Sequence, residues 1–356
     1  METMNNNLLY SLYYHITNRC NLKCRHCWVS SGDKLLDVEL TLGGAIDIIK
    51  QCQELGLESV KLTGGEPFVV SWLMDLVGFL FDENLNVTIE TNGTLISEDI
   101  ARQLAHYNNV SHIAISLDGS NASSHEYIRR VPGCFDQTIS GIKNLTAVGI
   151  RPQILVAVHK GNLDELADIG SMVTDLGLKS IKLNCIHGDG RGNDMAASNE
   201  TLDEDAIIDL FDSLEELERI SGAAFQLSMP LALRPMKKMT HHLCGSCNIV
   251  HTLGLLPNGD FALCGIGISI PELTFGNYRD HTVAEIWHGN TLIREIAEGI
   301  PDRLGGVCAE CIFKKLCRGG CRALAYVDNG SLLGPGKMCQ WARNSGKFPE
   351  SRLVTA

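Results

Sequence analysis

The chain has 356 residues, 44% of them hydrophobic, and a formal net charge of −12. A chain of this length can bury a large core without disulfides, and it is long enough for one large barrel or two ordinary domains. The acidic balance argues against a general nucleic-acid binder, since affinity for a polyphosphate comes mostly from Lys and Arg. The sequence shows no signal peptide and no apolar run approaching eighteen residues, so we expect a soluble, cytoplasmic protein without a membrane partner.

Short apolar and β-branched runs alternate with longer helical patterns over the first 185 residues. At 38–56 and 163–177, for example, apolar side chains recur at helical spacing. The runs that we expect to form strands are 12–17, 59–63, 86–91, 112–117, 153–158 and 180–185. Nearly continuous apolar strands separated by helices predict an α/β fold, with a parallel sheet covered by helices. Periodicity alone does not decide whether this sheet is doubly wound or curls into a barrel.

Polar motifs follow the first four predicted strands. They are residues 18–27, Gly64-Gly65-Glu66-Pro67, Thr91-Asn92-Gly93 and Asp118-Gly119. Doubly wound sheets and barrels both place their chemistry at the carboxyl ends of the strands. We therefore expect the functional site at this edge of the sheet.

The pattern changes in the last third of the chain. Residues 200–218 read as a solvated, acidic amphipathic helix, because Ile207, Phe211, Leu214 and Leu217 recur at helical spacing among carboxylates. Residues 251–264 predict a hairpin, in which Asn258-Gly259 supplies the tight turn. We place a domain boundary near 225 to 240 and divide the chain into residues 1–225 and 226–356.

The chain contains fourteen cysteines. In a reducing compartment such residues are more often metal ligands or catalytic groups than disulfides. Eleven of them form closely spaced groups, which are Cys20, Cys24 and Cys27; Cys244, Cys247 and Cys264; and Cys308, Cys311, Cys317, Cys321 and Cys339.

Zinc and iron-sulfur clusters are the two metal centres that such spacings allow. Paired C-x2-C units can build a closed zinc site of four thiolates. Tight runs at two-, three- and five-residue gaps favour cubane clusters, whose irons need thiolates around a larger object. The first group has only three cysteines, so a 4Fe-4S cluster there would keep one iron open to a small molecule.

The residues resemble a known family. CNLKCRHC at 20–27, LTGGEP at 62–67 and ISLDG at 115–119 are similar to motifs of the radical S-adenosylmethionine (SAM) superfamily, and residues 244–339 resemble its SPASM extension. This extension is named after maturases for peptides, a quinone cofactor and sulfatases. The resemblance covers nearly the whole chain. It implies a partial (β/α)6 TIM-like barrel, followed by a small Cys-rich domain with a β-hairpin and helices.

The resemblance implies a SAM site around the first three cysteines. Cys20, Cys24 and Cys27 should bind the catalytic cluster, whose open iron would be chelated by the amine and carboxylate of SAM. The Glu66 turn is similar to the stretch that receives the SAM amine, and Arg129 or its neighbour Arg130 should meet the carboxylate. The full set of expected cofactor contacts is Gly64, Gly65, Glu66, Pro67, Ser116, Arg129 and Ile186.

By the same resemblance, the remaining cysteine groups should hold two auxiliary clusters in an interleaved manner. One would be bound by Cys244, Cys247, Cys264 and Cys321, and the other by Cys308, Cys311, Cys317 and Cys339. Each auxiliary cluster would then have four thiolates and no open iron. The implied cofactors are SAM and three [4Fe-4S] clusters, with the auxiliary pair serving electron transfer.

The implied activity is reductive cleavage of SAM to a 5'-deoxyadenosyl radical, which abstracts hydrogen from a substrate. We expect a ribosomally synthesised peptide that is cross-linked or epimerised. Oxidation or decarboxylation in haem or cofactor biosynthesis, sulfatase maturation, and a multi-cluster electron carrier without enzymatic activity remain alternatives. A flavodoxin- or ferredoxin-type reductant is an expected partner. Because the first strand begins near residue 12, we also expect any leader peptide to dock elsewhere or on a separate protein.

The remaining cysteines and several polar residues carry weaker expectations. Cys185 ends the sixth predicted strand, where its thiol would be placed to return a hydrogen atom to a substrate radical. Cys52 should lie in the core, and Cys134 should be exposed in a turn. Two further expectations concern other side chains: His26 shapes the surroundings of the first cluster, and the pocket is lined by His187, Asp189 and Arg191.

Overall fold

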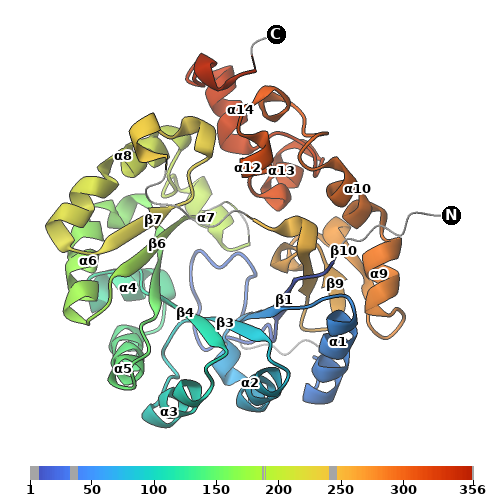
Figure 1. The fold of residues 1–356 in the computed structure, drawn as a ribbon. Coiled ribbons are helices and arrows are strands. Elements are labelled where there is room, and N and C mark those ends of the chain that lie inside the picture. The colour runs from blue at the N-terminus through green and yellow to red at the C-terminus, as the bar shows by residue number, and fades with distance from the viewer. Residues whose placement is uncertain (1–7, 33–38, 187, 189, 240–246, 355–356) are drawn as a thin grey trace.

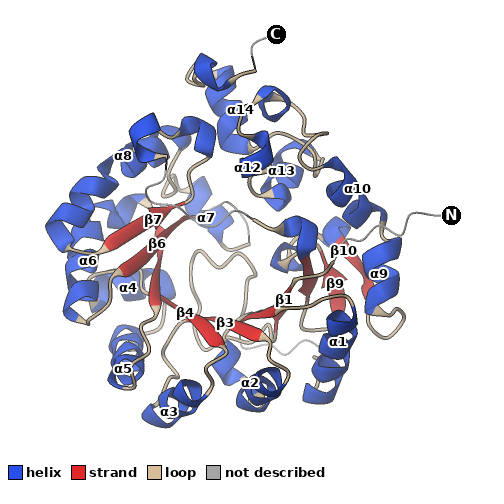
Figure 2. Ribbon diagram, in the orientation of Figure 1, coloured by secondary structure: helices blue, strands red, loops and turns tan. Residues whose placement is uncertain are grey.

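The computed structural model describes residues 8–32, 39–186, 188, 190–239 and 247–354. Ten strands in these residues form a single sheet in the order β10-β9-β8-β1-β2-β3-β4-β5-β6-β7 (Figure 2). Their bounds are β1 Ser11–His15, β2 Ser59–Thr63, β3 Asn86–Thr91, β4 Val110–Ser116, β5 Gln153–Val158, β6 Ser180–Cys185, β7 Ala224–Leu227, β8 Thr252–Leu255, β9 Asp260–Ala262 and β10 Thr274–Asn277.

Strands β1 to β7 run parallel and form an open arc, which confirms the parallel sheet and the partial barrel. Helices cover the outer side of this arc, and the segment after β1 lies inside it (Figure 1). The helices of this part are α1 Leu42–Glu54, α2 Leu73–Asp82, α3 Glu98–His106, α4 Ala122–Arg129, α5 Cys134–Ala147, α6 Leu166–Asp175, α7 Gly192–Ala197 and α8 Glu204–Ser221.

The alternation of side chains along the strands separates an apolar outer face from a polar inner face. Val60, Leu62 and Ile89 belong to the main core between sheet and helices. Lys61 and Glu90, at the intervening positions, lie half-buried on the inner face. The helices begin where the sequence provides side-chain caps, as at α3, where the Ser97 hydroxyl accepts a hydrogen bond from the Ile100 amide.

The sheet is larger than the sequence pattern predicts. Strand β7 was not anticipated, and its residues Ala224–Leu227 span the proposed boundary at 225. The expected hairpin is confirmed as β8 and β9, which pair antiparallel. However, β8 also pairs in parallel with β1, so the hairpin extends the barrel sheet. The division into residues 1–225 and 226–356 stays a prediction.

The C-terminal region is helical beyond the sheet. Its helices are α9 Val283–Gly289, α10 Thr291–Gly299, α11 Val307–Glu310, α12 Lys314–Cys317, α13 Arg322–Asn329 and α14 Lys337–Asn344. Helix α9 packs against the main core through Val283, Ile286 and Trp287, whereas α11, α13 and α14 contribute to two small separate clusters of buried residues. Among the described residues, no helix is both long enough and apolar enough to cross a membrane.

The structure also bears on three further predictions, which concern the acidic helix, Cys52 and Cys134. The predicted amphipathic helix is α8, which buries Phe211 and Leu214. Cys52 is fully buried, as expected. The prediction that Cys134 is exposed is wrong, because it begins α5 and packs against Leu22 and Cys24.

Candidate active site

The three-cysteine loop, residues 17–32, follows β1 and lies inside the arc of strands (Figure 1). Its two ends are joined, because the Cys20 amide donates to the Gly32 carbonyl at 3.0 Å. Its middle is fixed to the end of α4, where the Lys23 amide donates to the Arg129 carbonyl and the Arg25 amide to the Ile128 carbonyl. The fold thus holds the cysteines at the carboxyl end of β1, as the sequence predicts.

The thiols of this loop lie close together. Burial raises the pKa of Cys20 to about 12, and the neighbouring Glu66, Cys24 and Cys27 add to the rise, although the Leu22 amide opposes it. Among the described residues, no three His, Cys, Asp or Glu side chains are close enough to hold a single metal ion. A cubane cluster spreads its thiolates around a larger object, and the three convergent thiols are a donor set that fits one. Cluster binding by these three residues stays a prediction.

A buried ion pair stands directly behind Cys24. The Arg129 Nε donates to Asp118 Oδ2 at 2.6 Å, and its Nη1 lies 3.6 Å from Cys24 Sγ. Although burial opposes ionisation, Arg129, His26 and His125 lower the pKa of Asp118 to about 2. Burial raises the pKa of the Cys24 thiol, and the positive charge of Arg129 opposes that rise. Arg130 is exposed instead, so of the two adjacent arginines only Arg129 is buried beside Cys24.

Glu66 is fully buried and hydrogen-bonded within the protein. Its carboxylate accepts from the Thr91 hydroxyl at 2.7 Å, the Asn92 amide at 2.8 Å and the Phe68 amide at 3.1 Å. Burial raises its pKa, and these donors oppose the rise. The side chain thereby joins the end of β2 to the end of β3. Its expected contact with the SAM amine stays a prediction.

The two glycines before Glu66 let the turn approach the three-cysteine loop. A Cβ on Gly64, where φ is +145°, would lie 2.5 Å from the Thr17 carbonyl oxygen, and one on Gly65 would lie 2.0 Å from the Arg19 carbonyl oxygen. This close approach allows two hydrogen bonds between the turn and the loop. The Gly65 amide donates to the Thr17 carbonyl and the Glu66 amide to the Arg19 carbonyl, each at 2.8 Å.

Arg191 holds the same loop from the opposite side. Its Nε donates to the Cys24 carbonyl and its Nη1 to the Ser31 carbonyl, both at 2.7 Å, and its amide donates to the Cys27 carbonyl. The sequence predicted pocket lining here and missed this role, because a clamp on backbone carbonyls leaves no motif. His187 and Asp189, predicted to lie beside it, are outside the described residues.

The other expected SAM contacts lie near the ends of β2, β4 and β6. Pro67 is buried and opens a short 3-10 turn after β2, and Ser116 is half-buried at the end of β4. Ile186 is buried against Ile128, Ala157 and Met195. Their contacts with SAM stay predictions.

Cys185 lies at the end of β6 on the same face as Ile181 and Leu183, which belong to the main core. Burial raises the pKa of its thiol to about 11, so it is protonated at neutral pH. Its position packs it against apolar residues rather than placing it with the polar inner face. The hydrogen-donor role stays a prediction.

The inner face of the sheet carries mixed charge. Lys61 Nζ lies 2.7 Å from Glu90 Oε1 and 4.5 Å from the centre of the Tyr13 ring. His15 is buried beside Trp28, and neither of its ring nitrogens has a hydrogen-bond partner among the described residues. The inner face thus combines a Lys–Glu ion pair with a buried imidazole that has no hydrogen-bond partner among the described residues.

The larger C-terminal cysteine group surrounds a small cavity. Its lining includes four thiols together with apolar residues such as Ala232, Phe313 and Phe348, and the thiols are Cys308, Cys311, Cys317 and Cys339. The family resemblance implied the same four residues as one ligand set, and their binding of a cluster stays a prediction. Four thiols around one enclosed space are a donor set that fits a fully ligated cluster.

Residues next to three cysteines of the other expected set pack together. Ile249, Leu263 and Ala323 pack in one hydrophobic cluster, and each lies one or two residues from an expected ligand, namely Cys247, Cys264 or Cys321. The fourth, Cys244, is outside the described residues.

Arg322 links the two C-terminal groups. Its guanidinium is fully buried and donates to the Gly334 carbonyl at 2.7 Å and to the Leu332 carbonyl at 3.2 Å. Burial lowers its pKa, and thiols from both groups, including Cys308 and Cys321, oppose that shift. One buried cation therefore lies between the two sets.

Known protein families match both the barrel region and the Cys-rich C-terminal region of the chain. The Radical SAM superfamily profile matches residues 14–173, and an iron-sulfur cluster-binding SPASM domain profile matches residues 244–312. The chain is 30% identical to the mycofactocin maturase MftC of Mycobacterium tuberculosis, covering 92% of this chain and 82% of that protein. It is 28% identical to the AdoMet-dependent heme synthase of Methanosarcina barkeri, covering 90% and 93%.

A solved structure shares the fold. SuiB of Streptococcus suis, crystallised with S-adenosylmethionine, aligns with a TM-score of 0.72 at 17% identity, over 94% of this chain and 78% of that one.

Proposed function

This chain belongs to the radical SAM superfamily with a SPASM domain and is therefore an enzyme that uses SAM and iron-sulfur clusters, and we propose that it modifies a ribosomally synthesised peptide. Family membership sets aside the alternative of an electron carrier without enzymatic activity. A reducing compartment such as the cytoplasm suits a protein that needs many free thiols.

A cluster and SAM, when bound at the three-cysteine loop, would supply the radical chemistry that removes hydrogen from an unactivated carbon. The residues of this chain bind and position. Cys20, Cys24 and Cys27 are the proposed cluster ligands, while Arg129 holds a positive charge beside Cys24 at 3.6 Å. The inner face of the sheet, with Lys61 and Glu90, orients the substrate.

The proposal includes three clusters. The cavity lined by four thiols supports one auxiliary cluster, and the convergence of Cys247, Cys264 and Cys321 supports a second. With four ligands each, these clusters have no open iron, so their role is electron transfer. The first cluster has only three cysteine ligands, so one of its irons is open, and SAM is the proposed ligand of that iron.

The peptide assignment rests on the character of the inner face. Its half-buried positions carry a Lys–Glu pair, a tyrosine and a further lysine, Lys182, which suits a peptide with backbone and charged side chains. A haem precursor would bury a broad apolar ring and needs a matching apolar surface. Among the relatives, the maturase also has the higher identity, 30% against 28%.

Haem-pathway oxidation is the second proposal, because the heme synthase relative matches in length as well as sequence, with 93% of that protein covered. The two proposals differ in substrate and share the SAM chemistry. Each requires an external reductant of the flavodoxin or ferredoxin type. A separate leader-binding protein is a further partner that the peptide proposal allows.

The test is anaerobic co-expression in heavy water with candidate precursor peptides, followed by mass spectrometry. Loss of two hydrogens would indicate a cross-link or dehydrogenation, and gain of one deuterium at an otherwise unchanged residue would indicate epimerisation. The variant Cys24→Ala is the control, since it should leave every peptide unaltered. If the wild-type enzyme cleaves SAM while every peptide stays unaltered and a porphyrin substrate is oxidised, the peptide proposal is replaced by the haem-pathway one.

A further inference from the structure

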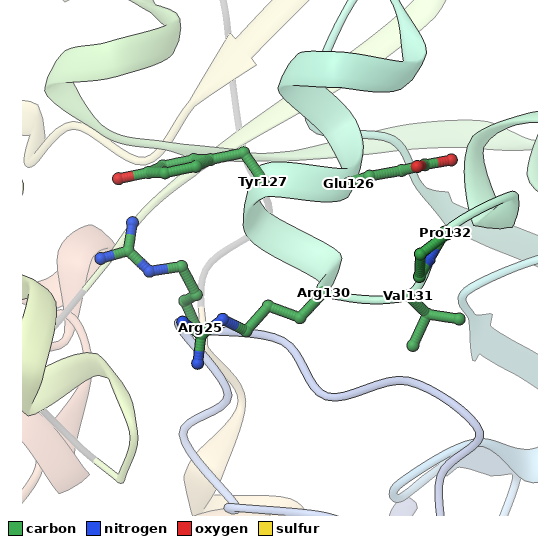
Figure 3. Close-up of a pocket in the computed structure, with 6 residues that line it drawn as sticks. All are labelled: Arg25, Glu126, Tyr127, Arg130, Val131 and Pro132. Carbon is green, nitrogen blue, oxygen red and sulfur yellow. The ribbon is translucent and has the colours of Figure 1, made fainter.

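An open pocket of about 470 Å³ lies on the outer side of the three-cysteine loop, between that loop and the end of α4. Its lining residues are Arg25, Glu126, Tyr127, Arg130, Val131 and Pro132, and Figure 3 shows Arg25 facing the ring of Tyr127. We name this surface, together with the neighbouring Lys160, the Arg130 patch. Of these residues only Arg130 was considered as a SAM contact, as the alternative to Arg129, and Arg129 is the one beside Cys24.

The patch includes a direct sequence neighbour of a proposed cluster ligand. Arg25 follows Cys24 in the chain, and its amide is bonded to the Ile128 carbonyl of α4. Arg130 follows Arg129, whose Nη1 lies 3.6 Å from Cys24 Sγ. A molecule seated on the patch would contact Arg25 and Arg130, which directly follow Cys24 and Arg129 in the chain. Electron transfer through protein needs short separations.

The carboxylates of the patch are already satisfied. Glu200 accepts both guanidinium nitrogens of Arg25, at 2.7 and 2.8 Å, and the Tyr127 hydroxyl at 2.9 Å. Glu126 accepts the amides of Gly133 and Phe135. Both carboxylates keep their charge, but their oxygens already accept hydrogen bonds within the protein.

Two cations of the patch remain available to a partner. Arg130, the C-terminal cap of α4, is exposed and has no ion pair among the described residues. Lys160 is exposed on the same side, where its amide donates to the Glu200 carbonyl and its Nζ to Asn199 Oδ1. With Arg25, the patch holds three cations against two carboxylates.

This surface contrasts with the rest of the chain. The whole protein carries a net charge of −12, and α8 alone holds seven carboxylates against one arginine. An acidic partner would be repelled by such a surface and attracted to a local cationic site. The exposed Tyr127 ring adds an aromatic contact of the kind enriched at protein interfaces.

We propose that the Arg130 patch is the docking surface for the electron donor, an acidic one-electron carrier protein of the flavodoxin type. The inference rests on the proposed function, which requires such a donor. The reduced carrier loses one electron on each encounter, and the cluster gains it through Arg129 and Cys24. Carboxylates around the exposed flavin of the carrier would pair with Arg130 and Lys160.

The experiment measures initial rates of 5'-deoxyadenosine formation by the reconstituted holoenzyme under anaerobic conditions. Two reductants are compared: flavodoxin hydroquinone over a range of concentrations, and reduced methyl viologen at saturation. The variants are Arg130→Glu and Lys160→Glu. The matched control is Lys143→Glu. Lys143 is also an exposed lysine, but it lies on α5, about 13 Å along the helix axis from the first residue of that helix, Cys134, and it does not line the pocket.

Arg130→Glu and Lys160→Glu should each raise the KM for flavodoxin about tenfold with little change in kcat, because reversing a rim charge chiefly slows association. The viologen-driven rate should stay at the wild-type value, and Lys143→Glu should behave as wild type with both reductants. High salt should weaken the wild-type response to flavodoxin and remove its advantage over the two variants.

Two outcomes would overturn the docking surface: unchanged kinetics with flavodoxin in both patch variants, or an equal loss of rate with flavodoxin and viologen. The equal loss would mean that the substitutions damage the cluster or SAM site. Failure of the wild-type enzyme to form 5'-deoxyadenosine with either reductant would instead remove the proposed function, and the docking surface with it.

Discussion

At the scale of single residues, the pairing of Asp118 with Arg129 organises the back of the three-cysteine loop. Asp118 is fully buried, and besides Arg129 its side chain accepts the Ala157 amide at 2.8 Å. The guanidinium therefore has a fixed position from which it contacts Cys24 Sγ. A buried ion pair of this kind tolerates the loss of both partners better than the loss of one.

Asp118→Asn should leave the Arg129 charge buried and unpaired. We expect a loss of about 3–5 kcal/mol in the free energy of unfolding, which is typical when one partner of a buried pair is removed. Urea denaturation of the anaerobic holoenzyme, followed by circular dichroism, measures it. The double variant Asp118→Leu with Arg129→Leu should recover part of the loss. A single variant as stable as the wild type would show that the pair contributes little.

Gly65→Ala tests the approach between the GGEP turn and the three-cysteine loop. The added Cβ would meet the Arg19 carbonyl oxygen at 2.0 Å, so the loop must shift and the first cluster should be lost. Iron content should fall from about twelve to about eight atoms per chain, and SAM cleavage should stop. Gly32→Ala is the matched control, since nothing lies within 4 Å of its added Cβ. Full iron content in Gly65→Ala would contradict the argument.

Much of the site at this scale is predictable from sequence, because cysteine spacing and the GGEP and ISLDG motifs carry chemistry in their residue types. The choice between Arg129 and Arg130 is not predictable, since adjacent arginines look alike in sequence, whereas in the fold Arg129 is buried and Arg130 is exposed at the end of α4. Cys134 was placed wrongly for a related reason. A helix beginning directly after Gly133, where φ is +80°, turns that cysteine toward the loop.

At the scale of elements, the segment between β6 and α7 clamps the three-cysteine loop through Arg191. This is a contact between residues about 160 positions apart in the chain, from Arg191 to Ser31. No local sequence pattern predicts this contact, because the groups that accept the Arg191 hydrogen bonds are backbone carbonyls, which every residue has.

Arg191→Met should loosen the loop while keeping its fold. Two side-chain hydrogen bonds are lost, whereas the bond from the Arg191 amide to the Cys27 carbonyl remains. A charged donor contributes about 1.5–3 kcal/mol per bond, so iron release to a chelator should accelerate at least tenfold for the first cluster. Arg151→Met is the control, since Arg151 also donates to two carbonyls but on an exposed surface. Equal release rates in the two variants would refute the clamp.

The strands show what local patterns do and do not determine. All six expected strands form, with ends displaced by two residues or fewer, because alternation and β-branched runs are local signals. Strand β7 has only four residues, AFQL, too few for a periodic signal. The pairing of β8 with β1 joins Thr252 to Ser11 and was not predictable, since it depends on the edge of the finished sheet.

At the scale of the whole molecule, we propose that the C-terminal cysteines are divided between two sites that interleave in sequence. Cys317 lines the four-thiol cavity, whereas Cys321, four residues later, interacts with Cys247, which supports its assignment to the other set. The short helix α12 and the glycine pair after it let the chain turn between the two sites.

Cys317→Ala and Cys321→Ala should therefore each remove a different cluster. Each single variant should keep about eight iron atoms, and the double variant about four, because four-iron clusters are lost independently. Iron analysis and electron paramagnetic resonance of the reduced proteins measure this. A double variant that retains as much iron as either single one would place both cysteines at one cluster and refute the interleaved assignment.

The central claim is that the three-cysteine loop supports reductive cleavage of SAM. The most direct test is the amount of 5'-deoxyadenosine formed from SAM by the reduced, anaerobic holoenzyme, compared with the variant in which Cys20, Cys24 and Cys27 are all alanine. We predict product with the wild type and none with the variant, which should still hold about eight iron atoms in its C-terminal clusters. Equal product from both proteins, or none from a wild type with a full set of clusters, would contradict the account.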